Sequence, residues 1–118
     1  MSVQHVSLET RPADVEAEVR FWALLGFEQV PAAGTLAERA TWVQAGTTQI
    51  HLLYADEPVV PPEGHAAVVC PAYIETLDAL LEAGFEIEER PAHWGAPRSF
   101  TRSPAGHRVE VMSAPPTG

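Results

Sequence analysis

Four side chains that bind metal ions well occupy corresponding places on four predicted strands: His5, His51, His65 and Glu110. Side chains alternate across a strand, so every second residue shares a face. In each of these strands the apolar neighbours mark the face that packs on a helix, and the metal-binding residue points away from it. A single strand histidine is more often an ordinary polar residue, so the prediction depends on the agreement of all four. Three imidazoles and a carboxylate suit one divalent ion per site: zinc, nickel, cobalt, manganese or ferrous iron.

Three further residues are candidates for contacting a substrate. Arg108 shares the predicted face of Glu110, so it is either an anchor for an anionic group or a surface arginine. Ser7 shares the predicted face of His5. Trp42 precedes a predicted hairpin turn and either lines the cleft or fills the core.

Other charged residues are placed on the surface. Arg98 and Arg102 flank Phe100, and we expect both to be solvated edge charges, with anion binding as the alternative. Residues 16–18, which include two glutamates, are expected on a solvated acidic surface.

The charge balance excludes several kinds of partner. The chain has 118 residues, 16 of them acidic and seven of them arginine, with a net charge of -9 and no lysine. Binding to nucleic acids or anionic membranes needs clustered cations, so neither is expected. Schiff-base chemistry and a Walker-type phosphate loop both need lysine. Cys70 is the one cysteine, no apolar run could span a bilayer, and no secretory signal is evident, so we expect a location in the cytoplasm.

Two similar halves must position these residues. Leu25-Gly26-Phe27-Glu28 corresponds to Ala83-Gly84-Phe85-Glu86 at an offset of 58 residues, and His5 corresponds to His65 at an offset of 60. Alternation and helical spacing predict strands over 3–9, 27–31, 40–45, 48–54, 65–69, 85–89, 98–102 and 108–112. A helix from Pro12 ends before Gly26, and another, over 74–81, ends before Gly84.

The predicted fold is therefore α+β and forms a single domain over residues 1–118. Two tandem βαβββ modules, about 2–55 and 64–113, are joined by a proline-containing linker. Neither module can bury its sheet alone. Together we expect them to form a curved mixed sheet that contains a cleft, with the helices outside.

The chain resembles the vicinal oxygen chelate superfamily over about Val3 to Met112. This superfamily includes glyoxalase I, fosfomycin-resistance thiol transferases, extradiol dioxygenases, methylmalonyl-CoA epimerase and bleomycin-binding proteins. The resemblance rests on the segments Gln4-His5-Val6, Phe21-Trp22, Leu24-Leu25-Gly26-Phe27, Gln49-Ile50-His51-Leu52-Leu53, Gly64-His65-Ala66-Ala67-Val68 and Gly106-His107-Arg108-Val109-Glu110. In metal-dependent members the ligands come from the first, fourth, fifth and eighth strands, and those positions match His5, His51, His65 and Glu110.

The resemblance implies an enzyme that binds two adjacent oxygens of a small organic substrate through its metal ion and stabilises an enolate or alkoxide. An isomerase, a lyase or a thiol transferase would fit, with Glu110 as a ligand that also exchanges protons. It further implies a homodimer whose cleft forms within one chain or between two. Glyoxalase I usually has glutamate or glutamine at the position of His51, and fosfomycin transferases use a lysine that this chain lacks. The alternatives are a protein that sequesters a cationic drug or metabolite, and a closed structural metal site.

Overall fold

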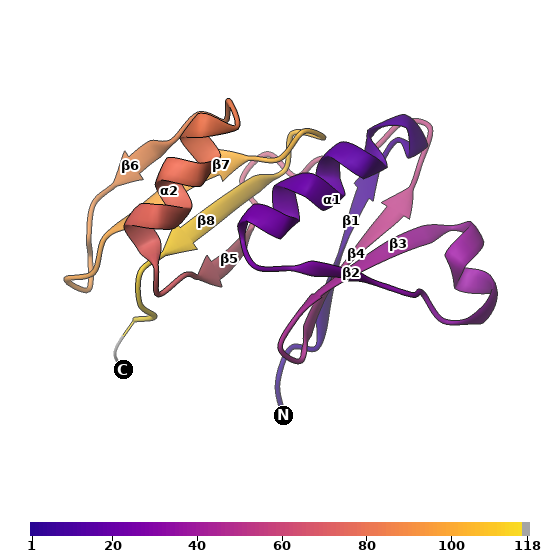
Figure 1. The fold of residues 1–118 in the computed structure, drawn as a ribbon, viewed down its shortest axis with the longest axis horizontal. Helices are drawn as coiled ribbons and strands as arrows, with labels where there is room; N and C mark the ends of the chain where they lie inside the picture. The colour runs from indigo at the N-terminus through magenta and orange to yellow at the C-terminus, as the bar shows by residue number, and fades with distance from the viewer. Residues whose placement is uncertain (117–118) are drawn as a thin grey trace. The chain divides into compact units, whose positions relative to one another are not determined.

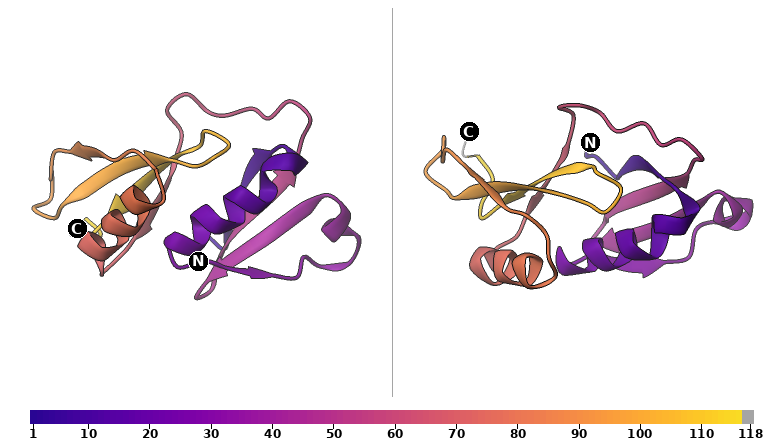
Figure 2. Two further views of the ribbon diagram at one scale, coloured as in Figure 1. Left: turned by 45° about the horizontal axis from the view of Figure 1, so that its top comes forward. Right: turned by 90° about the horizontal axis from the view of Figure 1, so that it is seen from above.

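The computed structural model describes residues 1–116 and consists of two compact units, Met1–Val60 and Pro61–Gly118. We call these units module 1 and module 2 and describe each by itself. The boundary falls within the proline-containing linker, an irregular connection that Figure 2 shows between β4 and β5.

Module 1 contains a four-stranded sheet and one α-helix. Its elements are β1 (His5–Thr10), η1 (Pro12–Asp14), α1 (Val15–Leu24), β2 (Glu28–Val30), η2 (Gly34–Glu38), β3 (Ala40–Ala45) and β4 (Thr48–Tyr54). The strand order is β1-β4-β3-β2, with β1 parallel to β4 and the other neighbours antiparallel. Helix α1 lies across one face of this sheet (Figure 1) and does not cover the opposite face.

The core of module 1 forms where α1 meets the sheet. Trp22 has no exposed surface, and its ring makes edge contacts with Phe21 at 5.4 Å and Phe27 at 5.3 Å. Gly26 follows the helix with φ of 92°, a conformation that glycine adopts without steric cost. The Phe27 N–H then donates to the Trp22 carbonyl at 3.0 Å, so the predicted end of this helix before Gly26 is confirmed.

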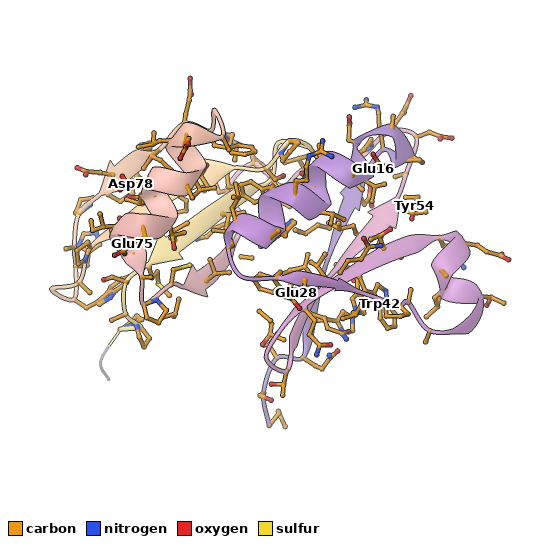
Figure 3. The ribbon with its side chains drawn as sticks, viewed as in Figure 1. Glu16, Glu28, Trp42, Tyr54, Glu75 and Asp78 are labelled. Carbon is orange, nitrogen blue, oxygen red and sulfur yellow. The ribbon has the colours of Figure 1, made fainter. Side chains whose placement is uncertain are left out.

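Module 2 repeats this arrangement. Its elements are β5 (Ala66–Val69), α2 (Tyr73–Glu82), β6 (Glu88–Arg90), β7 (Arg98–Arg102) and β8 (Arg108–Met112). The strand order is β5-β8-β7-β6, with β5 parallel to β8. The hydroxyl of Tyr73 forms a hydrogen bond with the Ser99 hydroxyl and links α2 to β7. Glu75 and Asp78 lie on the exposed side of this helix (Figure 3).

The start of strand β6 and the placement of Glu18 differ from the prediction. Strand β6 begins at Glu88 and not at Phe85, because the Phe85 N–H donates to the Leu80 carbonyl at 2.9 Å and so closes α2. Glu18 is fully buried, so its placement on the acidic surface is wrong. It lies one helical turn before Trp22, and this spacing puts both side chains on the face that packs on the sheet. Glu16 is exposed, as expected (Figure 3).

The α+β class and the βαβββ order of both modules are confirmed. The described strands form two four-stranded sheets, one in each module. None of the described helices has the length and apolar character that crossing a bilayer requires.

Candidate functional site

Three aromatic rings form a continuous stack on the sheet face of module 1 opposite α1. The His51 ring lies 4.1 Å from the Trp42 ring, with 4° between their planes. On its other side it lies 4.0 Å from the His5 ring, with 13° between the planes. Trp42 and His51 are direct cross-strand neighbours on β3 and β4, which explains their contact. Trp42, labelled in Figure 3, therefore lies beside the predicted histidines and not in the core under α1.

A chain of amide side chains fixes the protonation pattern of His51. Gln44 donates from Nε2 to the backbone carbonyl of Gly46 at 3.0 Å, and a carbonyl oxygen can only accept. The Gln44 Oε1 then accepts from Gln49 Nε2 at 2.7 Å. This leaves Gln49 Oε1 to accept from Nε2 of His51 at 2.8 Å. Nε2 of His51 therefore carries the hydrogen, and its Nδ1 holds the lone pair when the ring is neutral.

The environment of His51 favours its neutral form. The side chain is buried, with 8% of the residue exposed. Burial lowers the pKa of His51 below its ordinary value of 6.5, and the neighbouring charge of His5 lowers the pKa further. His51 is therefore a neutral imidazole at physiological pH, which is the form that binds metal ions.

The ring stack forms one wall of an open groove of about 820 Å³. Leu36 supplies apolar surface, Glu9 and Glu38 supply negative charge, and Arg39 supplies one positive charge. Glu9 also accepts a hydrogen bond from the Val59 N–H at 2.9 Å, which ties the start of the linker to β1. Ser7 is exposed and is the direct neighbour of His51 in the β1–β4 pairing, as its predicted face requires.

In module 2, His65 and Glu110 contact each other. Nε2 of His65 lies 3.2 Å from Oε1 of Glu110. Nδ1 of His65 is 2.8 Å from the backbone carbonyl of Glu63, so this nitrogen is the donor. The other carboxylate oxygen of Glu110 accepts from Nη1 of Arg98 at 3.1 Å.

Arg98 is the clearest correction to the predicted surface. Its side chain is 12% exposed, and it forms an ion pair with Glu110, so it is not a solvated edge charge. Arg98 sits on β7, the neighbour of β8, and its length lets it reach Glu110 diagonally across the strand pair. Arg102, two residues further along, is exposed as expected. The sequence places Arg98 and Glu110 on one face. Whether the Arg98 side chain extends into solvent or forms an ion pair with Glu110 depends on the packing around Phe100.

Phe100 lies at the centre of the sheet face of module 2 that also carries Glu110, Arg98 and Arg108, which we call the functional face of module 2. It is the direct cross-strand neighbour of Glu110, and its ring makes an edge contact with His65 at 4.8 Å. The Arg108 guanidinium lies 4.4 Å above the same ring, which is a favourable cation–π contact. Arg108 therefore shares the face of Glu110, as its strand position predicts.

The structure brings the four predicted ligands together as two pairs. His5 contacts His51 in module 1, and His65 contacts Glu110 in module 2. Within residues 1–116 no group of three or more histidine, cysteine, aspartate or glutamate side chains is arranged to hold a metal ion. The four-residue site therefore stays a prediction. Sequence reasoning missed Gln44 and Gln49, although their strand positions on the face of His51 are a signal for them.

Solved structures show that this fold recurs widely. A protein from Bacillus anthracis assigned to the glyoxalase family has a TM-score of 0.84 and 23% identity, covering 95% of this chain and 93% of that one. Lactoylglutathione lyase from Agrobacterium tumefaciens has a TM-score of 0.70 and 20% identity, covering 94% of this chain and 92% of that one. The fosfomycin resistance protein FosX from Listeria monocytogenes has a TM-score of 0.77 and 15% identity, covering 97% of this chain and 91% of that one.

No curated protein sequence matches the chain. The family model described as Glyoxalase/Bleomycin resistance protein/Dioxygenase superfamily matches residues 2–111, which include every predicted ligand. The chain belongs to the Glyoxalase/Bleomycin resistance protein/Dioxygenase superfamily.

Proposed function

We propose that the protein is a metal-dependent enzyme that acts on a small organic substrate with two adjacent oxygen atoms. His5, His51, His65 and Glu110 would hold one divalent ion, which is zinc, nickel, cobalt, manganese or ferrous iron. When bound, the ion would supply a fixed positive charge that stabilises negative charge on substrate oxygens. The fold relationship to a lactoylglutathione lyase and to a fosfomycin resistance protein supports an isomerase, lyase or thiol-transfer reaction.

The contact between His65 and Glu110 is the observation that carries this proposal. Nδ1 of His65 already donates to the Glu63 carbonyl, so in a neutral ring Nε2 presents a lone pair to the carboxylate. Two lone-pair atoms 3.2 Å apart repel each other unless a cation, a proton or a metal ion, joins them. The backbone carbonyl also orients the ring, as the outer partners of histidine ligands do in metal sites. The donor set of module 2 therefore fits a metal ion.

Individual residues of this chain would carry out proton exchange and substrate binding. Arg98 occupies Oε2 of Glu110, which leaves Oε1 as the atom available to a ligand or to a proton. Glu110 is therefore the proposed catalytic group for proton exchange. Arg108 would bind an anionic part of the substrate, and Trp42 and Ser7 would contact it from module 1.

The test is elemental analysis of the untagged protein and of a His65→Ala, Glu110→Ala double variant. We expect about one divalent ion per chain in the wild type and none in the variant. A His93→Ala variant, which removes an exposed loop histidine, is the matched control and should keep the ion. Wild-type protein that takes up none of the five metals after incubation would refute the proposal.

A homodimer is part of the proposal. The four ligands would then come either from both modules of one chain or from one module of each of two chains. A His5→Ala variant mixed with a Glu110→Ala variant distinguishes these cases. Mixed dimers regain an intact set of ligands only if each site is shared between chains. Restored metal binding therefore indicates shared sites, and no restoration indicates sites within one chain.

A second candidate is a protein that sequesters a cationic aromatic drug or metabolite. The groove of module 1 supports it, because Trp42 stacks on His51 in a groove where two carboxylates, Glu9 and Glu38, outnumber the one arginine, Arg39. We expect chelator-treated protein to bind a planar cationic dye, and Trp42→Leu to abolish that binding, if this function is correct. Equal dye binding by the wild type and Trp42→Leu would exclude this groove as the binding site.

A further inference from the structure

Two arginines on the functional face of module 2 lie directly opposite each other. Arg102 on β7 and Arg108 on β8 are cross-strand partners, and like charges at opposed positions destabilise a strand pair. Within residues 1–116 neither forms an ion pair with a carboxylate. Arg102 donates to the Gly106 carbonyl at 3.0 Å, and Arg108 stacks on Phe100.

The other arginines of this face differ in this respect. Arg90 pairs with Glu88 at 2.6 Å, and Arg98 pairs with Glu110 at 3.1 Å. The charges of Arg90 and Arg98 are therefore balanced within module 2.

The opposed arginines line a pocket of about 330 Å³. Phe100 contributes a wall, and Phe85 and Ile87 add half-buried apolar surface. Thr101 also lines the pocket, and its buried hydroxyl has no hydrogen-bond partner within residues 1–116. The pocket thus combines guanidinium donors with an apolar surface.

The charges around the pocket indicate which anion fits it. Arg102 and Arg108 contribute two unpaired positive charges. Glu86 also lines the pocket, is exposed and contributes one negative charge, while Glu88 is neutralised by Arg90. One positive charge at the pocket therefore stays unbalanced, which matches a monoanion better than a dianion.

We propose that this pocket binds the carboxylate of a small organic acid, with Arg102 and Arg108 on the carboxylate and the apolar part against Phe100. The planar fork of an arginine matches carboxylate geometry. Phe100 contacts Arg108 on its face and His65 at its edge, so an acid held here lies next to the His65–Glu110 pair. The inference rests on the proposed function, because it identifies the substrate of that enzyme as an organic acid.

The test is calorimetric titration of the protein as purified with benzoate, with the neutral isostere benzamide and with inorganic phosphate. We expect benzoate to bind, benzamide not to bind and phosphate to bind more weakly than benzoate. Arg102→Gln and Arg108→Gln should each weaken benzoate binding at least about tenfold. Glu86→Gln should strengthen it severalfold, because it removes the negative charge at the pocket.

The control variant is Arg11→Gln, which removes an exposed arginine of module 1 and should leave benzoate binding unchanged. Thermal unfolding of each variant shows whether it is folded. Benzoate binding that survives in folded Arg102→Gln and Arg108→Gln proteins would overturn the inference. So would equal binding of benzamide, tighter binding of phosphate, or no binding of benzoate to the wild type.

Chelator-treated wild-type protein separates this inference from the metal proposal. We expect benzoate to bind there as well, because the arginines do not depend on a metal ion. Loss of binding on chelation, with binding retained in the two arginine variants, would show that the acid binds the metal and not the pocket. Failure of the metal proposal is detected separately by elemental analysis.

Discussion

Nη1 of Arg98 lies 3.1 Å from Oε2 of Glu110, and the two side chains are only 12% and 9% exposed. Deleting one partner of an ion pair so well removed from water lowers the stability of the folded protein much more than deleting one partner of an exposed pair. It also gives the two oxygens of Glu110 different roles, since Oε2 is engaged and Oε1 faces His65.

Replacing Glu110 by glutamine in metal-free protein should therefore be destabilising. Glu110→Gln keeps the shape of the side chain but leaves the Arg98 charge poorly exposed and unpaired. We expect the free energy of unfolding, measured with urea, to fall by about 2 kcal/mol. Glu88→Gln breaks the exposed pair with Arg90 and should cost less than about 1 kcal/mol. Equal losses in the two variants would contradict this account of the buried pair.

The stability of the metal-free protein should depend on pH through His51. The pKa of His51 is lowered in the folded state, so below about pH 6.5 the unfolded chain binds the proton more readily than the folded one. Stability is thus fully present above 6.5 and declines as the pH falls toward the lowered value. His51→Gln should reduce this decline, whereas His93→Gln, in an exposed loop, should not. Urea unfolding at several pH values measures it, and an unchanged decline in His51→Gln would assign it to other groups.

Much of the fold follows from local sequence signals. The predicted bounds of β3, β4, β7 and β8 agree with the structure, because turn residues at 46–47 and 103–106 separate the strands of the two hairpins. Gly26 and Gly84 mark both helix ends, since each adopts a positive φ. The sequence does not predict the 3-10 turn over Gly34–Glu38, because this segment has no apolar periodicity.

The candidate site is predictable as a face but not as a set of contacts. Alternation puts His51 and Trp42 on one side of module 1, and Glu110 and Arg108 on one side of module 2. It does not determine which atom of His51 meets Gln49, since that depends on side-chain rotamers and on a hydrogen-bond chain ending at a backbone carbonyl. The burial of Glu18 likewise depends on what covers its helix face.

The tautomer of His51 should change when its amide partner is removed. Gln49→Met keeps the size of the side chain but removes the acceptor that holds the hydrogen on Nε2. Nitrogen chemical shifts of the imidazole distinguish the tautomers, and we expect Nε2–H in the wild type and a mixture in Gln49→Met. The free energy of unfolding should fall by about 1 kcal/mol, the usual value for a lost neutral hydrogen bond. Gln29→Met on the exposed strand β2 is the control, and a wild-type Nδ1–H tautomer would refute the amide chain.

Metal binding should stabilise the folded protein through His65. A ligand that binds only the folded state adds about 2.7 kcal/mol of stability at 100 times its dissociation constant. Titration of chelator-treated protein with zinc should therefore raise the unfolding temperature of the wild type in a concentration-dependent way. The gain should disappear in His65→Ala, which removes the imidazole facing Oε1 of Glu110, and remain in His93→Ala. Zinc that stabilises His65→Ala as much as the wild type would place the metal elsewhere, because the proposed site depends on that imidazole.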